Sequence, residues 1–243
     1  MNILAIGNSF TVDANRYLYE IARKDGADFK VATLYISGCT LDMHFRNMLS
    51  EQPAYALYHN GLATGFNVSM KEALLSRVWD VVTIQQGSSL SFRADSYHPY
   101  GEELVSYVRK MSPKAKIIVH QTWAYEQGSK KLTGAGYEDH KAMFADLKAA
   151  YQTLCERVNA VGIIPSGELF QKMLANGFET VHRDTYHATR GAGRYALALL
   201  WYRMLTGADV TDNTFCDFDE EVAPEQMQTI KTLVQAFQPL NLK

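Results

Sequence analysis

The sequence of 243 residues is poor in cysteine, with only Cys39, Cys155 and Cys216. An odd number of cysteines without C-x-x-C spacing predicts neither a disulfide framework nor a zinc site. Reduced thiols are typical of a cytoplasmic protein. The amino terminus also lacks a basic segment followed by a long apolar one, so no signal peptide is predicted. We therefore expect a cytoplasmic protein, or an exported one if the chain is a trimmed precursor.

An excess of charge of one sign is also missing. The formal net charge is -2 and no run of like charges occurs, so nothing favours a nucleic acid or an anionic membrane as partner. The most apolar stretch, Tyr195 to Leu205, contains Arg203 and is too short to span a bilayer. The partner that remains is a small neutral or polar molecule, and the oligomeric state is not predicted.

Several functional motifs are absent. The seven histidines show no H-E-x-x-H or comparable ligand spacing, so we predict no metal. Neither G-x-G-x-x-G nor G-x-x-x-x-G-K occurs, which lowers the case for a nucleotide, and we predict no cofactor. The nucleophile elbow G-x-S-x-G is missing too, which argues against the α/β-hydrolase fold.

The chain has ample material for one large core, since 47% of its residues are hydrophobic and 12% are aromatic. No linker divides it, so we predict a single domain over residues 1–243. Strand-like and helix-like segments alternate, which indicates a mostly parallel, five-stranded sheet covered by helices. The predicted strands are 2–6, 29–35, 80–85, 115–120 and 161–164. The predicted helices are 14–24, 69–77, 97–111, 135–159, 189–205 and 224–237.

Residues 53–67 interrupt this alternation. Two short apolar segments flank His59-Asn60-Gly61, a pattern typical of a β-hairpin. We expect a small hairpin insertion near the rim of the sheet.

The segment that follows the first strand carries the first candidate for chemistry. Ile3–Ile6 reads as a buried strand, and Gly7-Asn8-Ser9 turns the chain at its carboxyl end. Ligands of open α/β sheets bind at that edge, so Ser9 is a candidate nucleophile. The alternative is a polar turn that caps the next helix.

The second candidate is Asp184-Thr185-Tyr186-His187, directly before a long apolar helix. Side chains three residues apart share one face of a helical turn, so Asp184 can orient the His187 imidazole as a base. The alternative is a surface Asp–His pair or an aspartate opposite a helix dipole. Because loops at the carboxyl ends of strands converge, we expect both segments to meet.

At these two segments the sequence resembles the SGNH (GDSL-like) hydrolases, a superfamily of esterases and lipases. Gly7-Asn8-Ser9-Phe10 resembles the first block, and Asp184-Thr185-Tyr186-His187 matches the D-x-x-H block. The resemblance implies a three-layer α/β/α sandwich of flavodoxin-like type. It also implies a catalytic triad of Ser9, His187 and Asp184, with the amides of Ser9 and Gly38 in the oxyanion hole.

The third block departs from the family pattern G-x-N-D. Here Gln86 precedes Gly87-Ser88-Ser89, and Ser89 stands at the expected asparagine. Of these two candidates for the oxyanion hole we favour Gln86, since its amide NH₂ can donate over a longer reach. The alternative is a strand end followed by a polar loop.

Other side chains could line the pocket. Trp123 follows the fourth predicted strand and could stack on a sugar ring, although packing against a helix is the simpler account. Arg183 and Arg190 flank the acid–base pair and are candidates for contact with an anionic group.

We predict a serine esterase that removes a short acyl group, such as acetyl, from a carbohydrate or another small polar carrier. Two alternatives remain open from the sequence. One is a carbohydrate-binding protein of the same fold with weakened catalysis, and the other is an acyltransferase.

Overall fold

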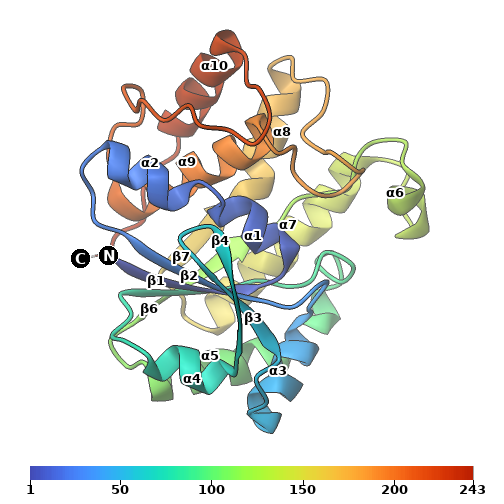
Figure 1. Ribbon diagram of the computed structural model, residues 1–243. Coiled ribbons are helices and arrows are strands. Elements are labelled where there is room, and N and C mark those ends of the chain that lie inside the picture. The colour runs from blue at the N-terminus through green and yellow to red at the C-terminus, as the bar shows by residue number, and fades with distance from the viewer. Residues whose placement is uncertain (243) are drawn as a thin grey trace.

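The computed structural model describes residues 1–242 (Figure 1). Within that range one sheet has seven strands in the order β4-β3-β2-β1-β5-β6-β7. The pairs β1–β2, β1–β5, β5–β6 and β6–β7 are parallel, which confirms the five predicted parallel strands. The strands are β1 (Asn2–Gly7), β2 (Lys30–Tyr35), β3 (Tyr55–His59), β4 (Leu62–Val68), β5 (Val81–Ile84), β6 (Lys116–Gln121) and β7 (Gly162–Pro165).

The predicted hairpin is confirmed, but it extends the sheet instead of standing beside it. β3 pairs antiparallel with β2, and β4 pairs antiparallel with β3. Asn60 and Gly61 both have positive φ angles, 50° and 82°, as a tight hairpin turn requires. The sheet therefore has seven strands and not five.

All the α-helices except α6 pack on one of the two faces of the sheet (Figure 1), and strand side chains alternate between these faces. Ile3 and Ala5 of β1 join the core under α1, α2, α8, α9 and α10, whereas Leu4 and Ile6 join the core under α3, α4, α5 and α7. The helices are α1 (Ser9–Asn15), α2 (Leu18–Lys24), α3 (Leu41–Ser50), α4 (Met70–Leu75), α5 (Tyr100–Met111), α6 (Lys130–Gly134), α7 (His140–Arg157), α8 (Ser166–Ala175), α9 (Ala192–Thr206) and α10 (Pro224–Gln235), with a 3-10 turn η1 (Ala94–Ser96).

The helix pattern differs from the prediction in two respects. The helix predicted over 14–24 corresponds to α2 and to the last two residues of α1, which begins at Ser9, and the chain breaks between them at residues 16–17. α3, α6 and α8 were not predicted. The buried face of α3 consists of Leu41, His44 and Met48. Because His44 is polar, these positions do not form a recognisable apolar pattern of helical period in the sequence.

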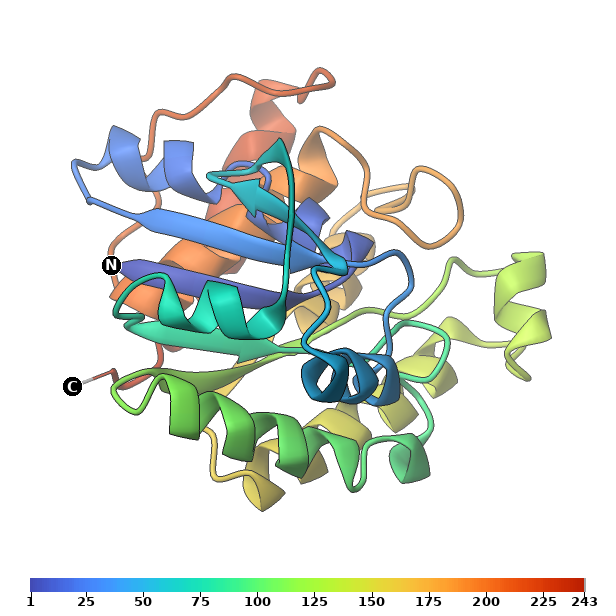
Figure 2. The same cartoon turned by 60° about the horizontal axis from the view of Figure 1, so that its bottom comes forward.

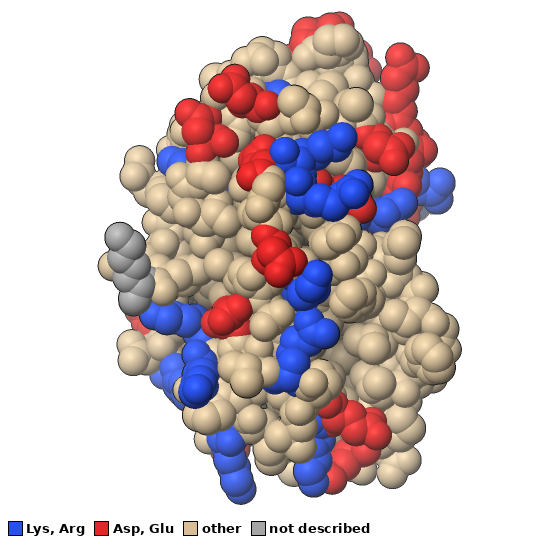
Figure 3. All heavy atoms as spheres, turned by 60° about the vertical axis from the view of Figure 1, so that its left-hand side comes forward, with Lys and Arg blue, Asp and Glu red and all other residues tan. Residues whose placement is uncertain are grey.

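The carboxyl ends of the parallel strands lie on one side of the molecule, together with α6 and the segment 178–191 (Figure 2). The opposite side shows basic and acidic side chains mixed together (Figure 3). No helix within residues 1–242 combines the length and the apolar composition needed to cross a membrane.

Candidate active site

Three side chains from the two ends of the chain form a continuous hydrogen-bonded series. His187 Nε2 lies 2.7 Å from Ser9 Oγ, and His187 Nδ1 lies 2.8 Å from Asp184 Oδ2. Because the Asp184 carboxylate can only accept, Nδ1 carries the proton and Nε2 is the acceptor for the Ser9 hydroxyl. This is the arrangement in which an imidazole can remove a proton from a serine.

Asn8 and Gly7 account for the position of Ser9 at the start of α1. Asn8 Oδ1 caps this helix by accepting from the Phe10 amide at 3.0 Å, and Asn8 Nδ2 donates to the Cys39 carbonyl at 3.1 Å. A Cβ atom at Gly7 would lie 2.0 Å from Thr11 Oγ1, so only glycine fits here.

A buried polar network below Asn8 was not foreseen. Gln85 Nε2 donates to Asn8 Oδ1 at 2.7 Å, while Gln85 Oε1 accepts from Thr11 Oγ1 and His120 Nδ1. Burial lowers the pKa of His120 to about 3, so its ring is neutral and its Nε2 accepts from Ser166 Oγ at 3.0 Å. Each hydrogen bond of this network pairs one donor with one acceptor, so the network fixes the position of the segment Gly7-Asn8-Ser9-Phe10.

The loop that carries Asp184 and His187 is anchored through its backbone. Asp184 Oδ1 accepts from the His187 amide at 2.9 Å. The Trp123 indole N–H donates to the Tyr186 carbonyl at 2.8 Å, and the Glu126 amide donates to the Thr185 carbonyl at 2.8 Å. Segments after β6 thus hold the acid–base loop against the sheet.

Asp13 of α1 is a second anchor that the sequence did not reveal. Its carboxylate is 1% exposed and accepts from Arg183 Nη1 at 2.9 Å, from Arg194 Nε at 2.9 Å and from the Ala188 amide at 3.2 Å. Arg183 and Ala188 flank the loop that holds His187, so α1 positions both the serine and the base.

The electrostatic surroundings keep Asp184 ionised. Partial burial by itself would raise the pKa of Asp184, but the hydrogen bonds from His187 and the charge of Arg183 outweigh it and lower this pKa below its ordinary value. An anionic Asp184 stabilises an imidazolium at His187.

The amides of Ser9 and Gly38 stay candidates for oxyanion donors, and Gly38 precedes Cys39, whose carbonyl accepts from Asn8 Nδ2. Ser9 N–H lies at the start of α1, and Gly38 sits in the exposed loop after β2 with a φ of 61°. Within residues 1–242 neither amide has a hydrogen-bond acceptor. The loop after β5 packs on this segment, since a Cβ atom at Gly87 would lie 3.1 Å from the Gly38 carbonyl oxygen.

The preference for Gln86 as an oxyanion donor does not fit the structure. Gln86 is completely buried, and its Nε2 donates to the carbonyl and hydroxyl oxygens of Ser96. Its Oε1 accepts from the Leu41 amide at 2.8 Å. Gln86 therefore links loops behind the site, whereas Ser89 is exposed at its rim.

Two further candidates also turn inward. The Trp123 ring is 1% exposed and stacks on Phe10 with a centroid distance of 4.1 Å, so it cannot stack on a sugar. Arg183 is committed to Asp13. Arg190 is exposed, and its amide donates to Glu220.

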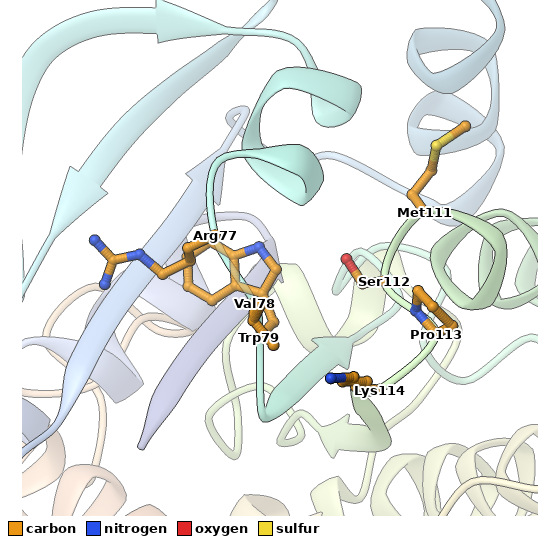
Figure 4. Close-up of a pocket in the computed structure, with 7 residues that line it drawn as sticks. All are labelled: Arg77, Val78, Trp79, Met111, Ser112, Pro113 and Lys114. Carbon is orange, nitrogen blue, oxygen red and sulfur yellow. The ribbon is translucent and has the colours of Figure 1, made fainter.

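Another hollow lies away from these residues, at the amino ends of β5 and β6. It measures about 170 Å³ and is lined by segments 77–79 and 111–114 (Figure 4). Ligands of parallel sheets bind at the carboxyl edge, so this hollow is not the candidate site. No group of three or more His, Cys, Asp or Glu side chains in residues 1–242 could hold a metal ion.

A family model described as a domain of unknown function, DUF4886, matches residues 2–236. The chain belongs to the DUF4886 family. It is similar to the crystal structure of a DUF4886 family protein from Bacteroides uniformis, with 30% identity and a TM-score of 0.88, over 97% of this chain and 93% of that one. A search of curated proteins finds no match.

Two solved structures of lower identity also share the fold of this DUF4886 chain. One is a candidate SGNH hydrolase from Slackia heliotrinireducens, with 23% identity, a TM-score of 0.61, and coverage of 84% of this chain and 97% of that one. Another is an acetyl xylan esterase from Geobacillus stearothermophilus, with 18% identity, a TM-score of 0.53, and coverage of 83% and 93%. The fold of this chain is therefore that of the SGNH hydrolases.

Proposed function

We propose that this DUF4886 protein is a serine hydrolase that cleaves a carboxylic ester through an acyl-enzyme. The observation that carries the proposal is the 2.7 Å contact between Ser9 Oγ and His187 Nε2, two atoms from residues 178 positions apart in the chain. The contact of Asp184 with the other ring nitrogen orients the imidazole and supports the role of base.

The steps follow from the atoms at the site. Ser9 Oγ attacks the ester carbonyl carbon while its proton passes to His187 Nε2. Asp184 stabilises the imidazolium, and the amides of Ser9 and Gly38 bind the oxyanion of the tetrahedral intermediate, each worth roughly 10²–10³ in rate. The intermediate collapses, the leaving alcohol takes the proton from His187, and water then attacks the acyl group by the same route.

We further propose a short acyl group, such as acetyl, on a carbohydrate or another polar carrier. The loop at Ser37 and Gly38 and the rim at Ser89 are exposed and polar, which suits a carrier with many hydroxyl groups. The fold that this chain shares with an acetyl xylan esterase supports the same class of substrate.

The central test is Ser9→Ala, assayed on p-nitrophenyl acetate. We expect kcat to fall by about 10⁴ or more, because the nucleophile is lost while binding remains. Wild type should react with a fluorophosphonate probe at Ser9, and Ser9→Ala should not. Ser50→Ala, which changes an exposed serine at the end of α3, is the matched control and should keep both properties. Equal turnover by wild type and Ser9→Ala would overturn the proposal.

The same assay addresses a second candidate, a binding protein with weakened catalysis. One observation favours it: Gln86, a potential third oxyanion donor, is engaged by Ser96. A wild-type protein that neither turns over esters nor reacts with the probe would favour that candidate. Faster release of p-nitrophenol when a sugar alcohol is added, with acyl sugar as product, would instead indicate an acyltransferase.

A further inference from the structure

A second hollow adjoins the candidate active site on the same edge of the sheet. It measures about 320 Å³ and lies between α6, the loop after β5 and the start of the loop after β6. Ser89, Phe92, Arg93, Tyr125 and Lys131 supply its side chains, and the end of α6 closes it. Figures 1 and 2 show α6 standing out from the body of the protein on that side.

Two ring contacts connect the hollow to the base. Lys131 Nζ lies 3.8 Å from the centroid of the Tyr186 ring, and that ring lies 4.0 Å from the His187 ring, centroid to centroid. On the other wall the Tyr125 hydroxyl donates to Ser88 Oγ at 3.3 Å. Lys131 is therefore separated from His187 by a single ring, that of Tyr186.

The hollow contains two cations and no carboxylate. Its lining includes Arg93 and Lys131 but neither aspartate nor glutamate. Within residues 1–242 neither side chain takes part in an ion pair. Asp146 of the neighbouring α7 is bound by the Tyr137 hydroxyl at 2.5 Å instead.

The aromatic contacts of Lys131 fix the ammonium group without neutralising it. Its Nζ is 3.8 Å from the Tyr186 centroid and 5.3 Å from the Tyr125 centroid. Cation–π contacts of this kind hold a charge in position through the ring quadrupole. The ammonium hydrogens that do not face the rings remain available to an anion.

We propose that this hollow is a subsite for an anionic group on the carrier of the ester, so that the enzyme prefers esters of acidic carriers over neutral ones. The proposal rests on the proposed esterase function. A carboxylate, as in an acetylated uronic acid, and a phosphate, as in an acetylated sugar phosphate, share the chemistry that Lys131 and Arg93 recognise.

The experiment compares substrates that share an acetyl group and differ in one substituent of the carrier. These are the O-acetyl esters of methyl galactopyranoside, methyl galactopyranosiduronate and methyl galactopyranoside 6-phosphate. For wild type we expect kcat/KM to be about 10- to 100-fold higher for an anionic carrier, which is the range for one or two charge-assisted hydrogen bonds. Comparison of kcat/KM for the two anionic substrates shows whether the subsite prefers a carboxylate or a phosphate.

Variants of Lys131 test whether this side chain causes the preference for anionic carriers. In Lys131→Met the ratio of kcat/KM for anionic over neutral carriers should fall about tenfold, and in Lys131→Glu it should invert. Lys130→Met is the matched control, because Lys130 is the adjacent exposed lysine of α6 and does not line the hollow. Its ratio should equal that of wild type, and added salt should reduce the wild-type ratio.

Different outcomes would overturn the subsite proposal and the esterase proposal. Turnover of p-nitrophenyl acetate with equal kcat/KM for anionic and neutral carriers would overturn the subsite alone. If wild type neither turns over p-nitrophenyl acetate nor reacts with the probe, the esterase proposal fails. The subsite is then tested by titrating the wild-type protein with methyl galactopyranosiduronate and measuring binding. Binding that Lys131→Met abolishes would support it, and no binding would overturn it.

Discussion

The residues of the site divide into those that face Ser9 and those that hold them. His187 contacts Ser9 and Asp184 contacts His187, while Asn8, Gln85, Trp123 and Asp13 act from behind. Two adjacent glutamines behind the site have different partners, although nothing in the local sequence distinguishes them. Gln85 joins the network under Asn8, whereas Gln86 bonds to Ser96.

At this scale we predict the effect of Asp13→Asn. The substitution leaves Arg183 and Arg194 without the buried carboxylate that both now share. The free energy of unfolding should fall by about 3 kcal/mol or more. The loop beyond Arg183 should also shift, and a displacement of the order of 1 Å can cost about 10²-fold in kcat. Chemical denaturation and steady-state kinetics at a temperature where the variant is folded measure both effects.

Asp219→Asn is the matched control for Asp13→Asn. Asp219 bonds to Arg194 and Arg16 but not to the Asp184–His187 loop. We expect lower stability without the same loss of kcat, and KM should change little in either variant. If Asp13→Asn is less stable but keeps the wild-type kcat, its role is stability alone.

Among the elements, the Asp184–His187 loop has the most unusual backbone. Thr185 has a φ of 74°, a region that β-branched residues rarely adopt because of steric conflict at Cβ. Its carbonyl accepts from the Glu126 amide, so the loop keeps this conformation through its anchor. Conformational strain is typical of functional loops held by the rest of the fold.

Replacement of Thr185 should release part of this strain. Asparagine tolerates left-handed backbone better than threonine, so Thr185→Asn should raise the free energy of unfolding by about 1 kcal/mol. Thr185→Val has nearly the same shape without that tolerance and should show no gain. Thermal denaturation measures both. A lower melting temperature for Thr185→Asn than for wild type would contradict the interpretation.

For the whole molecule, the difference in bound protons between the folded and unfolded states predicts how stability depends on pH. His44 and His120 are buried, and burial lowers the pKa of each to about 3. In the unfolded chain a histidine has a pKa of about 6.5. Between these values the unfolded state binds more protons, so stability falls as the pH falls, by up to about 1.4 kcal/mol per pH unit for each residue.

Denaturation between pH 6.5 and pH 5, above the range where most carboxylates titrate, tests this expectation. In His120→Gln the slope of stability against pH should decrease by about one proton compared with wild type. Lys130→Met changes an exposed side chain and leaves both buried histidines in place, so it should keep the wild-type slope. An unchanged slope in His120→Gln would show that His120 takes up its proton in the folded protein.

Much of this architecture could be read from the sequence because its signals are local. Apolar runs of four to six residues, the turn at Asn60 and Gly61, and the segments around Ser9 and His187 predicted the five parallel strands, the hairpin and the two ends of the site. Each of these depends on residues a few positions apart. The hairpin's place at the edge of β2 did not follow, since strand pairing joins distant segments.

The tertiary structure alone decided which polar and aromatic side chains face the ester and which are buried behind it. Trp123 packs on Phe10, and Lys131 lies over the ring of Tyr186. Asp13 accepts hydrogen bonds from Arg183 and Arg194. These partners lie more than 50 positions apart in the chain. Their hydrogen bonds and ring contacts depend on distances of a few ångströms that exist only after the core has packed, and no local pattern of residues encodes them.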